Sequence, residues 1–148
     1  MEEKTFRIYK ETLKVRGSFY FSVIGYSMFP FLLPLRKVKI GWKPFSHLRI
    51  GEIIAYKNGR GSLVIHRIIF KKKGEAITKG DFAFSCDPPV RERSYLGVVK
   101  DIEGRGRWCF RIINDILYPF PYLYSIFFLL LSPVIRPFLV LWGKLKSR

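Results

Sequence analysis

Apolar and polar residues alternate between Ser18 and Val23, with apolar side chains at the odd-numbered positions. This two-residue period, together with the aromatic content, predicts a half-buried strand. The strand would run into Gly25, where we expect the chain to turn. Before it, residues 3–15 carry apolar side chains among charges at the spacing of a short amphipathic helix that ends near Gly17.

Further short apolar runs follow, rich in β-branched and aromatic residues and separated by glycine-containing turns. They predict strands at Val38–Gly41, Ile53–Lys57, Leu63–Phe70, Glu75–Thr78 and Tyr95–Glu103. The clearest hairpin signal is Asn58-Gly59 with Gly61 close behind, because Asn-Gly between two apolar runs favours a tight turn. The fold class expected is therefore mainly β, built as an antiparallel sheet or small barrel.

The end of the chain has a different character. The 20 residues from Ile116 to Ile135 carry no charge, which is long enough to span a bilayer. Prolines within and beside this run would kink or break a helix, so a kinked span and a hydrophobic hairpin both remain open. The chain thus divides into an N-terminal amphipathic helix (1–17), a β domain (18–110) and a C-terminal hydrophobic, membrane-associated segment with a basic tail (111–148).

The charge balance indicates an anionic partner. Among 148 residues, Lys and Arg number 27 and Asp and Glu 11, a formal net charge of +16. Nucleic acid and anionic membrane lipid both fit such an excess. The basic residues are dispersed and match no DNA- or RNA-binding motif, so we expect no nucleic-acid partner. The hydrophobic segment favours membrane lipid, bound through residues 116–142.

The cysteines suggest no metal or redox chemistry. Cys86 and Cys109 are too few for a disulfide framework and lack the paired spacing of a zinc site. We therefore expect no cysteine-bound metal, and the serine and histidine chemistry described below needs neither a metal nor an organic cofactor.

Three segments carry residues suited to proton and acyl transfer. Ser27 follows the Gly25 turn at the end of a predicted strand, where a serine is exposed and could act as a nucleophile if a base reaches it. His66 interrupts an apolar strand, and a neutral imidazole can accept a proton near pH 7. Asp81 and Asp87 lie on one glycine-containing loop, and either could orient the histidine. Each of these residues also has a purely structural interpretation, as a turn residue, a buried histidine or a turn-capping aspartate.

In this order the segments resemble the signal peptidase I family, in its Ser/His branch of the endoplasmic reticulum and archaea. The similarity runs from about Ser18 to about Lys100 and consists of several dispersed motifs. These are Gly-Tyr-Ser-Met-Phe-Pro at 25–30, Gly-Glu-Ile-Ile at 51–54, Ile-His-Arg-Ile at 65–68, Thr-Lys-Gly-Asp at 78–81 with the later Asp87, and Leu-Gly-Val-Val at 96–99. The bacterial branch has a lysine base at the place of His66.

The resemblance implies a signal peptidase/LexA-like antiparallel β domain and a membrane-associated serine endopeptidase that cleaves signal or leader peptides after small residues. In that family's terms Ser27 is the nucleophile, His66 the general base, and Asp81 or Asp87 the residue that orients the base. Met28, Phe29 and Pro30, next to the nucleophile, are expected to contact a precursor polypeptide substrate. The location implied is a membrane, the plasma membrane of a prokaryote, on a side that the sequence does not indicate.

Two departures from the family pattern keep an alternative open. Gly25 stands where many members have a hydroxyl residue that serves as a second oxyanion donor. Leu35 and Arg36 stand where the family usually has Gly-Asp. The alternative is a catalytically inactive relative that binds peptides or anionic lipid.

Overall fold

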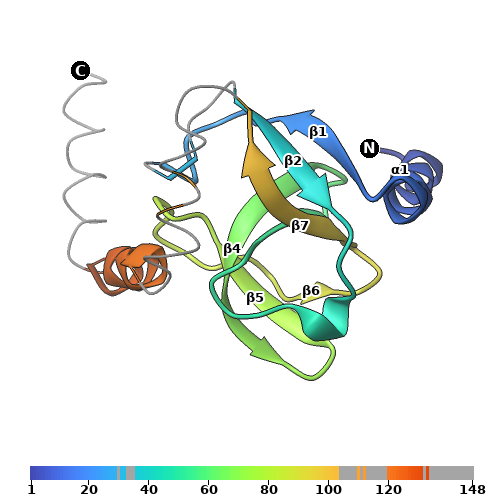
Figure 1. Ribbon diagram of the computed structural model, residues 1–148. Helices are drawn as coiled ribbons and strands as arrows, with labels where there is room; N and C mark the ends of the chain where they lie inside the picture. Colours follow the sequence, from blue (N-terminus) through green and yellow to red (C-terminus); the bar gives the residue numbers. More distant parts are fainter. Residues whose placement is uncertain are drawn as a thin grey trace, which may run out of the picture.

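A seven-stranded antiparallel sheet forms the body of the protein (Figure 1). The computed structural model describes residues 1–29, 31–32, 36–103, 110, 112, 120–131 and 133. The strands are β1 (Ser18–Ser22), β2 (Lys37–Gly41), β3 (Ile53–Lys57), β4 (Leu63–Lys72), β5 (Glu75–Lys79), β6 (Val90–Arg91) and β7 (Tyr95–Ile102). Their order in the sheet is β1-β2-β7-β3-β4-β5-β6. The prediction of a mainly β, antiparallel fold is confirmed.

The predicted strands agree closely with those observed. The hairpin around Asn58-Gly59 pairs β3 with β4, placing Ile54 opposite His66. The sequence did not predict β6, because two residues are too few to produce a periodic pattern. A short 3₁₀ helix, η1 (Phe45–His47), precedes β3, and His47 is exposed there as expected for a surface histidine.

The predicted N-terminal helix is α1 (Glu3–Arg16), and it packs against the sheet through one face. Phe6 and Leu13, seven residues apart and therefore on the same side of the helix, are both buried in the core. Tyr9 packs its ring against two aromatic side chains of β1.

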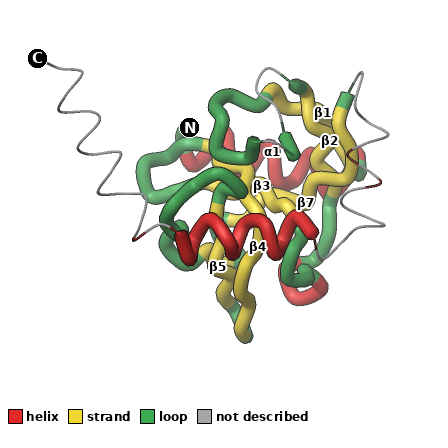
Figure 2. Tube along the Cα trace, turned by 90° about the vertical axis from the view of Figure 1, so that its left-hand side faces the viewer, coloured by secondary structure: helices red, strands yellow, loops and turns green. Residues whose placement is uncertain are grey.

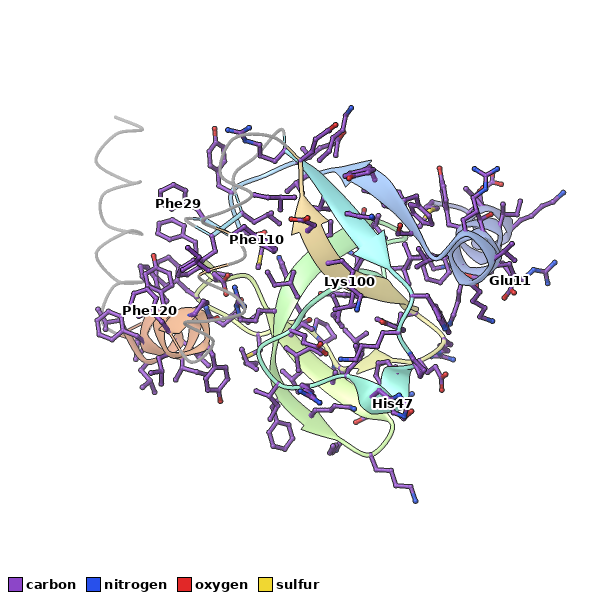
Figure 3. All side chains as sticks on the ribbon, in the orientation of Figure 1. Glu11, Phe29, His47, Lys100, Phe110 and Phe120 are labelled. Carbon is purple, nitrogen blue, oxygen red and sulfur yellow. The ribbon has the colours of Figure 1, made fainter. Side chains whose placement is uncertain are left out.

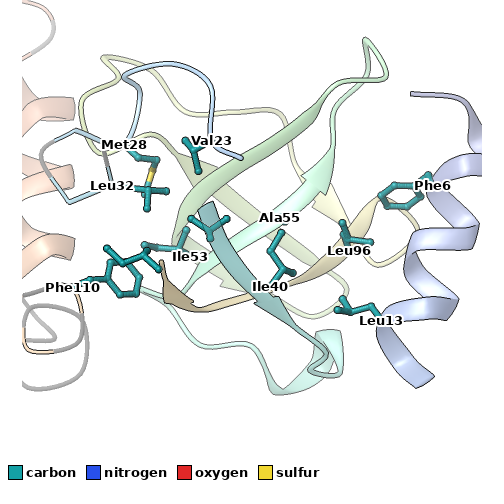
Figure 4. Close-up of a cluster of buried hydrophobic side chains, with 12 residues drawn as sticks. Phe6, Leu13, Val23, Met28, Leu32, Ile40, Ile53, Ala55, Leu96 and Phe110 are labelled. Atoms are coloured by element: carbon teal, nitrogen blue, oxygen red, sulfur yellow. The ribbon is translucent and has the colours of Figure 1, made fainter. Parts of the chain in front are cut away.

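Two hydrophobic clusters lie on opposite faces of the central strand β3. Ile53 and Ala55 belong to the first cluster, which also receives the apolar residues of α1 (Figure 4). Ile54 and Tyr56 belong to the second. Because successive side chains of a strand point to opposite faces, this alternation shows that β3 is covered on both sides. The sheet is thus a rigid base for the loops at its edge.

Residues 120–131 form a helix on the side of the sheet opposite to α1 (Figures 1 and 2). Within the described residues, no helix combines the length and the apolar character needed to cross a membrane. Of the 116–142 segment that we expect to contact lipid, residues 116–119, 132 and 134–142 lie outside the described residues.

Candidate active site

Ser27 lies in the loop that follows β1, and its side chain is exposed. The predicted turn is present: Gly25 has a φ of 102°, a conformation that L-residues with a side chain rarely adopt. The chain therefore leaves the strand sharply, and the turn presents the Ser27 hydroxyl at the surface while the next residue, Met28, points into the core.

The imidazole of His66 joins two of the predicted residues. Its Nε2 atom lies 2.9 Å from Oγ of Ser27, and its Nδ1 atom lies 2.6 Å from Oδ2 of Asp87. The three side chains come from the loop after β1, the middle of β4 and the loop between β5 and β6. Only 13% of the His66 side chain and 23% of the Asp87 side chain are exposed. The hydrogen-bonded chain Asp87–His66–Ser27 thus opens to solvent at its serine end.

Asp87 is held in place by two buried hydroxyls. Thr78 donates a hydrogen bond of 2.8 Å to Oδ2 of Asp87, and the hydroxyl of Tyr56 lies 3.1 Å from that of Thr78. Burial raises the pKa of Asp87, but the hydrogen bond and charge of His66, with the bonds from these hydroxyls, outweigh it and leave the pKa below its ordinary value. Asp87 is therefore an ionised acceptor for the Nδ1 proton of His66.

Asp81, the other candidate for this role, pairs with a different residue. Its two carboxylate oxygens accept hydrogen bonds of 2.8 Å from Nε and Nη2 of Arg67. Arg67 also donates to the carbonyl oxygen of Gly51. Burial raises the pKa of Asp81, and the two bonds from Arg67 oppose that shift. Both side chains are almost fully buried. The structure thus brings Asp87 to His66, and Asp81 ties β4 to the loop after β5.

The loop that begins at Gly80 lies directly against the nucleophile. A Cβ atom added at Gly80 would lie 2.5 Å from the carbonyl oxygen of Ser27, 2.9 Å from its Cβ and 3.1 Å from Nε2 of His66. The backbone N–H of Phe82 donates a 2.8 Å hydrogen bond to that same Ser27 carbonyl. Only a glycine permits so close an approach, so this loop sets the position of the Ser27 backbone.

Lys79 fixes the same loop from the other side. Its ammonium group is fully buried and donates to the carbonyl oxygens of Gly80 (2.9 Å) and Asp81 (3.3 Å). The third partner is the hydroxyl of Ser125, at 3.2 Å, on the helix of residues 120–131. Burial lowers the pKa of Lys79, and the charge of Asp81 opposes that shift. The sequence placed Lys79 in a motif but did not indicate that it binds a distant helix.

The residues expected to contact substrate differ in how exposed their side chains are. Met28 is only 1% exposed and belongs to the first hydrophobic cluster, so its side chain is turned away from the surface beside Ser27. Phe29 is 41% exposed and packs edge-on against Phe82, which is 42% exposed. Pro30 lies outside the described residues. An aromatic surface therefore borders the Ser27 hydroxyl, and it comes from Phe29 and Phe82.

Candidate metal ligands and cysteines were also located among the described residues. Among the described residues, no group of three or more His, Cys, Asp or Glu side chains is arranged to hold a metal ion. Cys86 is a free, exposed thiol, and Cys109 lies outside the described residues.

Comparison with known proteins found neither a protein-family model nor a curated protein that matches the chain.

Proposed function

We propose that the protein is a membrane-associated serine endopeptidase, with a signal peptidase/LexA-like β domain, that cleaves signal or leader peptides after small residues. The observation that carries this proposal is the hydrogen-bonded chain from Asp87 through His66 to Ser27. Its members come from separate segments, and they are residues to which the resemblance to the signal peptidase I family assigns a role. Such a chain is recognised by geometry and roles rather than by spacing in sequence.

The geometry fits acyl transfer without a cofactor. Oγ of Ser27 attacks the carbonyl carbon of the scissile bond while its proton passes to Nε2 of His66. The C–N bond of the tetrahedral intermediate then breaks, and His66 returns the proton to the leaving amine. Water attacks the acyl-Ser27 ester, again giving a proton to His66, and the released serine takes it back. Asp87 stabilises the imidazolium that forms twice in the cycle.

The oxyanion of the intermediate needs a donor. The backbone N–H of Ser27 is the natural first donor, and removing one such donor typically costs roughly 3–4 kcal/mol in the transition state. Gly25 has no side-chain hydroxyl that could serve as a second oxyanion donor.

Substrate and location are proposed from the resemblance and the surface around Ser27. A signal peptide presents a small-residue stretch just outside the bilayer, so its cleavage needs a site close to the lipid. The net charge of +16 suits anionic headgroups, and an uncharged helix lies near the site. We propose that the protein acts at the plasma membrane of a prokaryote on a precursor polypeptide.

The direct test is cleavage of a peptide with an Ala-x-Ala site by the detergent-solubilised protein. We expect cleavage after the second alanine, and none of a matched peptide whose two alanines are replaced by tryptophan, since the proposed specificity is for small residues. Mass spectrometry of the products locates the cut, and a serine-directed phosphonylating reagent is expected to label Ser27. A folded protein that neither cleaves nor becomes labelled would contradict the proposal and favour the inactive, peptide- or lipid-binding alternative.

A methyl group at Gly80 is expected to lower kcat about 100-fold, because a misplacement of about 1 Å at a reacting group has that order of effect. In Gly80→Ala the new Cβ meets the Ser27 backbone, which must shift. The matched control is Gly59→Ala in the β3–β4 turn, where an added Cβ meets nothing within 4 Å. Steady-state kinetics and thermal unfolding of both variants separate lost activity from lost fold. Wild-type kcat in Gly80→Ala would show that the loop does not position Ser27.

A further inference from the structure

The helix of residues 120–131 has an apolar face that the described protein leaves uncovered. Its sequence contains no charged residue. Four large side chains recur at intervals of three and four residues, which places them on one side of the helix. They are Phe120, Leu123, Phe127 and Leu130, with exposed fractions of 57%, 59%, 56% and 70%. We call these four residues the outer stripe. A continuous row of this kind is typical of an interaction surface.

The opposite side of the same helix packs on the loop beside the nucleophile. Phe128 stacks near the rings of Phe82 and Phe84, with centroid distances of 5.2 and 5.9 Å. Ser125 is fully buried and accepts the hydrogen bond of Lys79. The helix therefore connects the outer stripe to the loop that carries Gly80 and Phe82.

We propose that the outer stripe lies on an anionic lipid surface and that this contact orders the loop at Ser27 through Ser125 and Lys79. The part that concerns catalysis rests on the proposed peptidase function. In this arrangement Ser125 and Lys79 are positioning residues: neither bonds to the Asp87–His66–Ser27 chain, and both act through the backbone of Gly80 and Asp81.

A lipid surface fits the outer stripe better than a second copy of the chain does. Two copies would each bring a net charge of +16, whereas anionic headgroups attract that charge. The outer stripe covers one side of the helix while the opposite side packs on the protein, so the helix would lie in the interface plane. The exposed ring of Phe29 lies on the same side of the sheet as Phe120 (Figure 3). Phe29 in turn packs against the exposed ring of Phe82.

The contacts of Lys79 explain how a movement of the helix would affect the loop at Ser27. An ammonium group has three donors, and the three acceptors observed are two loop carbonyls and Ser125. If the helix moves away, the buried cation loses one acceptor, and the loop loses the ring contacts of Phe82 and Phe84 with Phe128. The loop would then loosen, and with it the hydrogen bond from Phe82 N–H to the Ser27 carbonyl. Docking of the helix on lipid opposes that loss.

The first experiment measures flotation of the full chain with vesicles of phosphatidylcholine and phosphatidylglycerol at 7:3. Leu123→Glu/Leu130→Glu is expected to weaken binding at least tenfold. The matched control is Ile8→Glu/Val15→Glu, which also places two carboxylates seven residues apart at exposed apolar positions, on α1 at the other side of the sheet. The control should bind within about twofold of the wild type. Equal binding by all three proteins, or equal loss in both variants, would overturn the lipid contact.

The second experiment measures amide hydrogen exchange of residues 79–87 with and without the same vesicles. In the wild type, vesicles should slow exchange of the Phe82 amide at least tenfold. Ser125→Ala should bind vesicles normally but show less than a twofold change, and its kcat should lose any stimulation by lipid while its KM stays constant. Unchanged exchange in the wild type, or full protection in Ser125→Ala, would overturn the coupling. Neither flotation nor exchange needs peptide cleavage, so an inactive protein that passes both tests would refute the peptidase function alone.

Discussion

Replacing Ser27 with alanine is expected to lower kcat for peptide cleavage about a millionfold, the scale observed when the nucleophile of a serine protease is removed. The reason is geometric: the exposed Ser27 hydroxyl is the group bonded to Nε2 of His66. Replacing His66 with alanine should have an effect of the same order, because the two residues act as a unit. The double variant should therefore lose little more than either single one.

Matched controls for these variants exist in the chain. Ser62 is another exposed turn serine, and His47, the only histidine besides His66 in the sequence, is also exposed. Ser62→Ala and His47→Ala should each retain activity within about twofold. Steady-state kinetics would be measured beside circular dichroism of every variant. Substantial cleavage by folded Ser27→Ala would mean that the nucleophile lies elsewhere, and a strictly additive double variant would mean that Ser27 and His66 do not form a unit.

Local patterns were enough to predict most of the sheet and two of the site residues. The two-residue period of β1 and the Asn58-Gly59 turn are local signals, and both elements are present as predicted. Ser27 and His66 became candidates from their positions beside a glycine turn and inside an apolar strand, and the resemblance to the signal peptidase I family supplied their expected roles. A strand or a turn depends mainly on residues that are close together in the sequence, so the sequence alone is sufficient to predict it.

Local sequence patterns could not indicate which of the two aspartates contacts His66. His66 and Arg67 are neighbours on β4, so their side chains point to opposite faces of the sheet. Each needs a carboxylate on its own face. Asp81 follows β5 directly and meets Arg67, whereas the chain between it and Asp87 bends until Asp87 reaches His66. The course of that loop depends on tertiary contacts that no spacing rule encodes.

The burial of Met28 and the hydrogen bond between Lys79 and Ser125 also depend on tertiary contacts, so the sequence did not predict them. The loop after Gly25 is irregular, and no period indicates which of its side chains faces the core. Lys79 and Ser125 are 46 residues apart in the chain, and they meet only because the helix of residues 120–131 packs on the loop. Long-range contacts of this kind appear only once the fold is known.

The two aspartates should respond differently to replacement by asparagine. Asp87→Asn is expected to lower kcat about 10⁴-fold, because the amide favours the wrong tautomer of His66, and to cost less stability than Asp81→Asn. Asp81→Asn removes the charge opposite Arg67, and breaking a buried pair on one side typically costs about 3–5 kcal/mol of unfolding free energy. Urea unfolding and kcat measured on both variants separate these effects. Equal loss of stability in the two variants would contradict the assignment of Asp87 to His66 and Asp81 to Arg67.

The dependence on pH gives an independent check on Asp87. Its pKa lies below the ordinary value of 3.8, so the carboxylate favours the folded state at every pH above that value. This contribution is lost only as the pH falls through the lower, folded-state pKa. The stability advantage of the wild type over Asp87→Asn should therefore decrease as the pH falls below about 4, as measured by urea unfolding between pH 2 and 5. An advantage that stays the same from pH 5 down to pH 2 would mean that folding does not lower the pKa of Asp87.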